Sequence, residues 1–159
     1  MNNVHNTHIE SRLIRDLHEA MIDIVTLMNR PQRDEQMVRE AGIALDRALF
    51  PLLVGIGRRG PIGIVELAEG TGRDYSTVSR QVTKLEGLDL VERRQSATDK
   101  RVNEAVVTIK GKVMIDKIDA AREKLARSIF KTWDQHDVNE LVRLMRRFAS
   151  AVNEHPETG

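Results

Sequence analysis

Hydrophobic residues at both ends of the chain recur every three or four positions, which is the spacing of one helical face. The first series comprises Ile9, Leu13, Leu17, Met21, Ile24 or Val25, and Met28. Towards the C-terminus, two more series are separated by 134–137: one comprises Val113, Ile118, Ala121, Leu125, Ile129 and Trp133, and the other runs from Val138 to Val152. The pattern therefore predicts one long amphipathic helix at the N-terminal end and two at the C-terminal end.

Proline and glycine divide the segment that follows the first helix. Residues 29–34 contain Pro31 and are predicted to break the helix, because proline lacks an amide donor and disfavours helical geometry in the residue before it. A second helix is predicted to begin after the Ala41–Gly42 pair and to run to Ile56, with a start, kink or boundary at Pro51. Residues 57–61 are predicted to end that helix in a turn.

The middle of the chain predicts a helix–turn–helix. A short helix is expected over 64–69 and a tight turn at 70–72, after which Asp74 is a good N-cap for a second helix. The buried face of this second helix is predicted to contain Val78, Val82, Leu85 and Leu88.

A small hairpin is predicted to follow. Residues 90–94 and 102–108 are rich in β-branched side chains and flank a polar, charged loop at 96–101, which indicates two antiparallel strands. Thr108 is then an N-cap candidate for the next helix. The fold predicted is mainly α with a small β-hairpin wing.

Length and composition exclude several classes of protein. The chain has 159 residues, enough for one core, and its 40% hydrophobic and 31% charged residues are typical of a globular protein. No apolar run is long enough to span a bilayer and the first residues do not resemble a signal peptide, so we expect a cytoplasmic protein without membrane contact. A Gly-rich phosphate loop and a nucleophile motif are both missing, so we expect no enzyme and no cofactor.

Cysteine and histidine usage limits the chemistry further. The absence of cysteine excludes disulfides and thiol-based sensing. The five histidines, His5, His8, His18, His136 and His155, are scattered, so no metal site is expected.

Charge is distributed unevenly, although the net charge is only +1. Residues 58–112 contain eleven Lys and Arg against eight Asp and Glu. A positive excess is the sign expected where phosphates are approached, and it falls on the predicted helix–turn–helix and hairpin.

The second helix of the predicted motif carries candidate DNA-binding side chains. Small hydroxyl side chains permit close approach to a groove, Arg80 can pair with guanine, and Gln81 can pair with adenine if it points inward. Lys84 suits a phosphate, and Tyr75 suits a sugar or base edge. The candidates are Tyr75, Ser76, Thr77, Ser79, Arg80, Gln81 and Lys84. The alternative is an ordinary capped surface helix.

The predicted hairpin carries a second set of candidates. Four basic residues occur within nine positions, and Asp99 is placed to orient an arginine. A basic loop suits the negative potential of a minor groove. The candidates are Arg93, Arg94, Asp99, Lys100 and Arg101, and the alternative is a solvated turn.

The central block contains its motifs in a definite order: Ile64-Val-Glu-Leu-Ala, Asp74-Tyr-Ser-Thr-Val-Ser-Arg, the segment Lys84–Arg94, Asp99-Lys-Arg101 and Thr108-Ile-Lys-Gly111. In type and spacing these resemble the winged helix–turn–helix of the MarR family of transcription regulators. The resemblance implies that Ser76, Thr77, Ser79 and Arg80 meet a major groove and that Arg101 lies near a minor groove.

The same resemblance implies a mode of regulation. Members of the family are homodimers that bind pseudo-palindromic operators in double-stranded DNA, usually as repressors, and many release DNA when a small molecule enters a cleft beside the dimer helices. Candidate cleft residues are Met21, Val25, Leu53 and Ile118, which suit a hydrophobic core equally well. The family's thiol-sensing branch requires a cysteine, which this chain lacks.

The terminal helices predict how the chain assembles. Their apolar stripes are wider than a small winged domain can cover, so a homodimer is expected, with a monomeric helical bundle as the alternative. The predicted division is 1–42 and 112–159 for dimerisation, with 43–111 as the DNA-binding domain. The predicted function is a ligand-released repressor, and the alternative is a winged-helix protein-interaction module that does not bind DNA.

Overall fold

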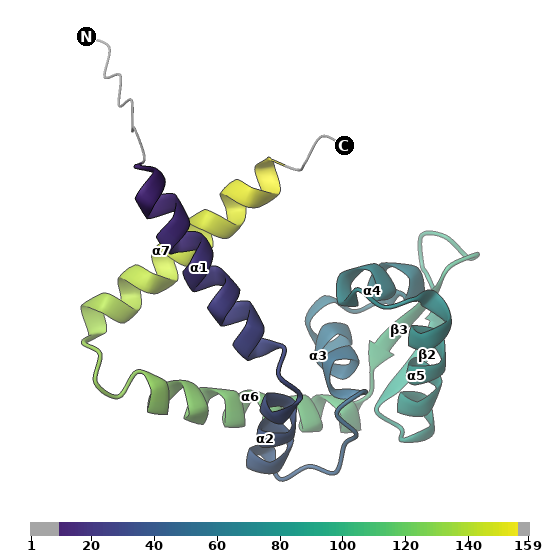
Figure 1. The fold of residues 1–159 in the computed structure, drawn as a ribbon. Helices are drawn as coiled ribbons and strands as arrows, with labels where there is room; N and C mark the ends of the chain where they lie inside the picture. Colours follow the sequence, from purple (N-terminus) through teal and green to yellow (C-terminus); the bar gives the residue numbers. More distant parts are fainter. Residues whose placement is uncertain (1–9, 156–159) are drawn as a thin grey trace. The chain divides into compact units, whose positions relative to one another are not determined.

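The computed structural model describes residues 10–155, and in this part of the chain it contains seven helices and one small sheet (Figure 1). The predicted fold class, mainly α with a small β wing, is confirmed. In chain order the elements are α1 (Ser11–Met28), α2 (Pro31–Ala41), α3 (Phe50–Arg59), β1 (Ile62–Gly63), α4 (Ile64–Thr71), α5 (Tyr75–Gly87), β2 (Val91–Gln95), β3 (Asn103–Val107), α6 (Ile109–Ile129) and α7 (Gln135–Glu154).

The hydrophobic core lies where α3, α4, α5 and the sheet meet (Figure 1). Each helix contributes residues spaced three or four apart, as an apolar face requires. The fully buried members include Leu52, Leu53, Ile56, Ile62, Leu67, Val78, Val82, Leu85, Leu90 and Ile118. This winged core therefore holds the helix–turn–helix against the hairpin.

The sheet has three strands, whereas the sequence predicted two. Its order is β1-β3-β2 and both pairings are antiparallel. The two-residue strand β1 was not predicted because it is stabilised by a distant partner, with Ile62 opposite Ala105. Strand β2 is consequently an edge strand, paired only on the β3 side.

The segment between α1 and α3 differs most from the prediction. The first helix ends at Met28, but residues 31–34, which were expected to belong to the break after it, begin helix α2 with Pro31 at its first position. Proline is well tolerated there because the first amides of a helix have no partner within the helix. The helix predicted to begin after Gly42 was wrong over residues 43–49, since α3 begins only at Phe50. Pro51, where a helix start was left open, lies in the first turn of α3.

The boundaries of the helix–turn–helix follow local rules. Gly72 ends α4 in the left-handed conformation, with φ of 64°. Asp74 caps α5 as predicted, because its side chain accepts a hydrogen bond from the Thr77 amide. Leu88 was wrongly placed on the buried face: it is 44% exposed because α5 ends at Gly87 and Leu90 enters the core instead.

The start of α6 is fixed to the end of α5 and to β2. The Thr108 hydroxyl accepts from the Gly111 amide at 3.0 Å, which confirms the predicted cap, and donates to the Asp89 carbonyl at 2.6 Å. A side chain at Gly111 would overlap the carbonyl oxygen of Leu90. Glycine at this position therefore permits the close approach of α6 to the hairpin.

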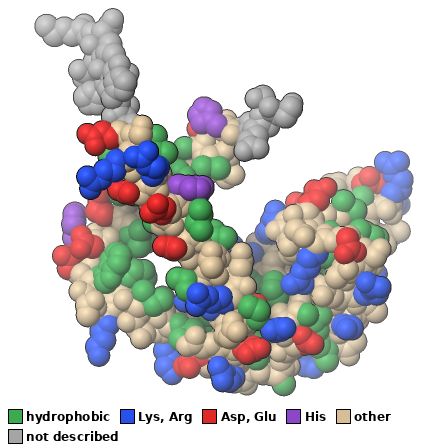
Figure 2. Space-filling model, in the orientation of Figure 1, with side chains coloured by type: hydrophobic (Ala, Val, Ile, Leu, Met, Phe, Trp, Pro, Cys, Tyr) green, Lys and Arg blue, Asp and Glu red, His purple; other side chains and the backbone are tan. Residues whose placement is uncertain are grey.

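The chain divides into two compact units after Ile118. In the first unit, α1 is amphipathic and none of its residues is buried. In the second, α7 also buries no residue; it begins at Gln135, because Asp134 accepts from the Asp137 amide as an N-cap. The predicted interruption at 134–137 is therefore the cap and first turn of α7. Figure 2 shows hydrophobic side chains on the surface of this view.

Two predictions fall partly outside the described residues. Ile9, the first apolar position of the predicted N-terminal helix, precedes them, as do His5 and His8. Within residues 10–155, no helix is long and apolar enough to cross a membrane.

Candidate nucleic-acid interface

The first turn of α5 is held by its cap. The Asp74 carboxylate accepts from the Thr77 amide at 2.8 Å and from the Thr77 hydroxyl at 2.7 Å. The hydrogen bond from the Thr77 side chain is the main cause that lowers the pKa of Asp74 from its usual value. The Thr77 side chain therefore points back towards the cap, and its hydroxyl proton is engaged in the hydrogen bond with Asp74.

The other candidates on α5 fall into two groups. Tyr75, Ser76, Arg80 and Lys84 are exposed. Ser79 and Gln81 are half-buried, like Thr77. The exposed group can approach a ligand directly, whereas each member of the half-buried group has a protein partner.

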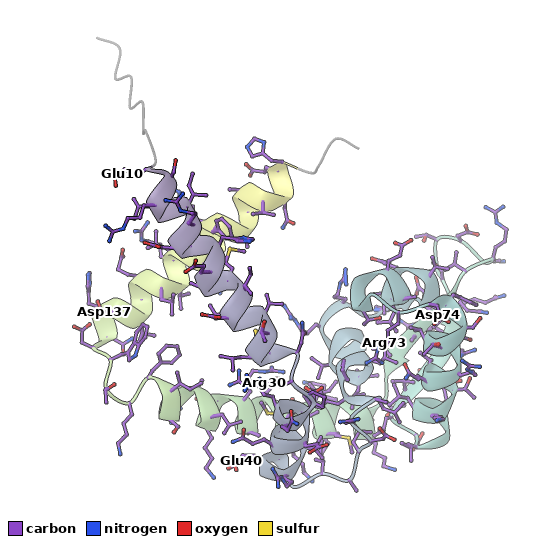
Figure 3. The ribbon with its side chains drawn as sticks, in the orientation of Figure 1. Glu10, Arg30, Glu40, Arg73, Asp74 and Asp137 are labelled. Atoms are coloured by element: carbon purple, nitrogen blue, oxygen red, sulfur yellow. The ribbon has the colours of Figure 1, made fainter. Side chains whose placement is uncertain are left out.

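Arg73 supplies the partner of Gln81 and was not among the sequence candidates. It lies in the turn between α4 and α5, beside the labelled Asp74 (Figure 3). Its guanidinium donates to the Ala48 carbonyl at 2.8 Å and to Gln81 Oε1 at 2.9 Å. Arg73 thus joins the loop before α3 to the middle of α5, and the oxygen of Gln81 is taken in this arrangement.

The pKa of Asp34 in α2 is raised above its usual value. The main cause is loss of hydration on burial, and the positive charges of Arg73 and Arg47 act in the opposite direction. The carboxyl of Asp34 is therefore electrostatically linked to the same arginine that holds Gln81.

The wing tip is an ordered turn. Ser96 is buried, and its hydroxyl accepts from the amides of Thr98 at 3.3 Å and Asp99 at 3.4 Å. The Ser96 amide donates to the Val102 carbonyl at 2.9 Å and closes the turn. Ser96 was missed by sequence reasoning, although a serine two and three residues before Thr98 and Asp99 is a recognisable turn signal.

Asp99 orients Arg101, as the sequence predicted. Asp99 Oδ1 accepts from the Arg101 amide at 3.1 Å and lies 3.2 Å from Arg101 Nε. The bond from the Arg101 side chain is the first cause that lowers the pKa of Asp99. The Arg101 side chain is 90% exposed, so its charge is presented to solvent at the projecting end of the wing, where Figure 2 shows basic side chains.

The two neighbouring arginines of β2 differ in their surroundings. Arg94 is exposed, whereas Arg93 is half-buried and its guanidinium contacts α5. Side chains alternate between the two faces of a strand, which accounts for the difference. Lys100, at the tip, is exposed.

The beginning of α5 and the wing border one hollow of about 500 Å³. Its lining includes Tyr75 from α5, Val65 from α4, and Asp99, Arg101 and Val102 from the wing. Tyr75 at the start of α5 and the oriented Arg101 of the wing consequently open to the same hollow.

The four candidates for a ligand cleft are not brought together. Leu53 and Ile118 are fully buried in the winged core, whereas Met21 and Val25 are exposed on α1. Leu53 and Ile118 have the surroundings of core residues. Among residues 10–155, no group of three or more His, Cys, Asp or Glu side chains could hold a metal ion.

Comparison with known proteins agrees with this arrangement. The model of the MarR family matches residues 45–102, the segment that contains the helix–turn–helix, β2 and the wing loop. Over this segment, about a third of its length, the chain is similar to the MarR family. It is 28% identical over 129 residues to YxaD of Bacillus subtilis strain 168, described as an HTH-type transcriptional regulator, with 81% of this chain and 90% of that protein covered.

Solved structures of MarR-family proteins have the same fold. A family member from Bacillus stearothermophilus superposes with a TM-score of 0.76 at 16% identity, covering 91% of this chain and 99% of the other. Staphylococcus aureus MarR, in complex with salicylate and kanamycin, superposes with a TM-score of 0.69 at 17% identity, covering 92% and 96%. The chain thus shares the fold of these proteins beyond the matched segment.

Proposed function

We propose that the protein is a sequence-specific, dimeric DNA-binding repressor that a small molecule releases from its operator. The observation that carries the proposal is the shared exposure of two elements on one side of the winged core. Tyr75, the exposed first residue of α5, and the oriented Arg101 border the same hollow. One duplex can therefore meet both elements.

The proposed contacts divide by groove. Helix α5 enters the major groove, where Arg80 reads a guanine and the neighbouring Ser76 approaches base edges or phosphate. Tyr75 and Lys84 contact the backbone, and Arg101, held by Asp99, enters the adjacent minor groove. Thr77, Ser79 and Gln81 support the helix through their protein partners. In the wing, Arg94 and Lys100 add charge near phosphates.

The proposed assembly is a homodimer in the cytoplasm. Residues 1–42 and 112–159 form its dimerisation elements, and 43–111 its DNA-binding domain. The exposed apolar stripes of α1 and α7 support this division, because large apolar stripes are costly when they face water. Two-fold pairing of chains would present two α5 helices to the two halves of an inverted repeat.

Release by a small molecule is supported by the shared fold. The fold is shared with Staphylococcus aureus MarR, whose structure contains salicylate and kanamycin. For this chain, Met21 and Val25 on α1 are the accessible candidates for an effector contact, while Leu53 and Ile118 can act only as the underlying wall. No cofactor or metal is part of the proposed function.

Selection of bound duplexes from a random pool tests the proposal. The expected product is an inverted repeat bound with strong salt dependence, since the logarithm of affinity falls by about 0.9 per phosphate contact per logarithmic unit of salt. Arg80→Ala should weaken operator binding by about 1–3 kcal/mol and relax the preference at one base position of each half-site.

Lys84→Ala is the matched control on the same helix. It should weaken specific and random duplexes alike and reduce the salt slope by about one contact. Equal losses on both duplexes for Arg80→Ala would remove its assigned role. Failure of the wild-type chain to select any duplex would favour a winged-helix module that binds protein instead.

A further inference from the structure

We propose that Arg93 and Glu86 are positioning residues that fix α5 relative to the wing and thereby determine operator specificity, without contacting DNA. This inference rests on the DNA-binding function proposed above. It assigns Arg93 a role different from that of the other basic residues of the hairpin. The contacts of these two side chains carry the argument.

The side chain of Glu86, a residue of α5, lies at the unpaired edge of the sheet. Strand β2 pairs with β3 on one side only, so amides on its outer edge need other partners. Glu86, one residue before the end of α5, accepts from the Arg93 amide at 3.2 Å. The carboxylate therefore joins the last turn of α5 to the middle of β2.

The Arg93 side chain forms a second connection in the same place. Its Nη2 donates to the Ser79 carbonyl at 2.7 Å and to the Thr83 hydroxyl at 3.1 Å. Its Nε is buried and lies 3.4 Å from Glu86 Oε2. One guanidinium thus contacts three successive turns of α5, at residues 79, 83 and 86.

This group of contacts restrains the movements that would alter groove spacing. Sliding α5 along β2, or rotating it about its own axis, would separate Arg93 from Ser79 or from Glu86. Ser79 directly precedes Arg80, and Arg93 lies on the same hairpin as Arg101. The angle between the helix that reads bases and the loop beside it is therefore determined where Arg93 meets α5.

The surroundings of Arg93 also reduce its use as a phosphate ligand. Glu86 offsets its charge and both partners are only about one-third exposed, at 29% and 32%. Arg94, the next residue, is exposed, so its charge is accessible from solvent. A positioning role and a phosphate-binding role for Arg93 consequently predict opposite results for two substitutions.

The first test removes the carboxylate. If Arg93 bound phosphate, Glu86→Ala would strengthen DNA binding by removing a competing negative charge. If the two residues position α5, Glu86→Ala should weaken binding to the selected operator by about tenfold, the scale of one lost charged hydrogen bond, while binding to random duplex changes little. Glu92→Ala is the matched control, because it removes the same charge from an exposed site on β2.

The second test keeps the positive charge. Lysine replaces arginine well as a point charge at a phosphate but cannot reproduce a branched set of hydrogen bonds. We expect Arg93→Lys to lose about tenfold in operator affinity. Arg58→Lys, which makes the same change at an exposed residue of α3 outside the proposed interface, should bind as the wild type does.

Thermal unfolding, measured on each variant, separates positioning from simple loss of folding. A variant that is fully folded at the assay temperature and has a reduced ratio of specific to random affinity supports the inference. Stronger binding by Glu86→Ala, or operator binding by Arg93→Lys equal to the wild type, would overturn it while leaving the proposed function intact. A wild-type chain that prefers no duplex would overturn both.

Discussion

The winged core and the terminal helices both contain apolar side chains at helical spacing, but only the winged core buries them within the chain. In the winged core, Leu52, Leu53 and Ile56 of α3 are almost completely buried by the chain itself. In α1 and α7, apolar residues with the same helical spacing are exposed to solvent: Leu17 is 50% exposed and Met145 is 53% exposed. Amphipathic periodicity therefore predicts that a face will be covered, but not what covers it.

The difference separates two sources of stability. Buried apolar surface within one chain stabilises that chain at any concentration. An apolar stripe that only a second chain can cover contributes through association, so its effect depends on protein concentration. Substitutions in the two regions should accordingly differ in kind as well as in size.

The largest effect on folding is expected in the winged core. Leu53→Ala should lower the free energy of unfolding by about 2–5 kcal/mol, because the side chain is fully buried and its removal leaves a cavity. Chemical denaturation measures the loss, and the change should be the same at low and high protein concentration. A loss below about 1 kcal/mol would show that Leu53 lines a space that tolerates truncation, as a ligand cleft would.

The next effect is expected on α7 and concerns association. At about 100° per residue, Met145 lies at the centre of the apolar stripe and Ser150 lies on the polar side. Met145→Asp should raise the dimer dissociation constant by about 100-fold or more, since it places a charge in the interface. Sedimentation equilibrium measures this constant, and Ser150→Asp adds the same charge as a control. An unchanged mass for Met145→Asp would contradict the account of the stripe.

A smaller effect is expected at the wing. Arg101→Ala should reduce operator affinity by about tenfold, most strongly where the sequence beside the half-site is rich in A·T pairs. Lys100→Ala removes the same charge from a neighbouring exposed residue and should reduce affinity less, because Asp99 orients only Arg101. Fluorescence anisotropy on duplexes that differ in these flanks measures both. Equal losses for the two variants would mean that orientation by Asp99 has no role.

The smallest effect is expected at the cap of α5. Asp74→Ala should lower the thermal midpoint by a few degrees, whereas Asp74→Asn should retain most of the stability because asparagine is also a good N-cap. The folded state lowers the pKa of Asp74 from its usual value of 3.8. Its charge therefore stabilises the fold fully above that value, and this stabilisation is lost as pH falls from there through the lower pKa of the folded state.

The difference between wild type and Asp74→Ala should therefore be constant from neutral pH to about pH 4 and shrink in more acidic solution. Thermal unfolding followed by circular dichroism at several pH values measures it. A difference that grows with acidity would reverse the assigned sign. The corresponding cap of α7, Asp134, offers the same substitution in the region expected to depend on association.

Local signals in the sequence were sufficient to predict the helix–turn–helix. The cap at Asp74, the cap at Thr108 and the β-branched strands each act within a few residues, and all three were predicted. The caps need no distant partner, which explains why the start of α5 could be predicted closely.

Features that depend on distant residues were not predictable in the same way. Helix α2 is largely polar, and its apolar residues Met37, Val38 and Ala41 are recognisable only by their packing against the winged core. Strand β1 has two residues and is defined by pairing with β3. In both cases the neighbour across space, not the local pattern, decides the structure.

The candidate site shows the same limit. Arg93, Arg94, Lys100 and Arg101 are equivalent as charges in the sequence, and only the structure separates them by their partners. Strand alternation distinguishes Arg93 from Arg94, but the contact with Glu86 depends on how α5 lies against the sheet edge. Arg73 was missed because its acceptors, Ala48 and Gln81, are distant from it or lie in another element.

In the proposed complex, two copies of the chain bind one two-fold site. Light scattering on the complex with a selected operator duplex measures its mass and hence the number of bound chains. We predict two chains on each duplex, bound to an inverted repeat whose half-sites lie about 34–36 Å apart, one turn of B-DNA or a multiple of it. One chain per duplex, or selected sequences without an inverted repeat, would contradict the account.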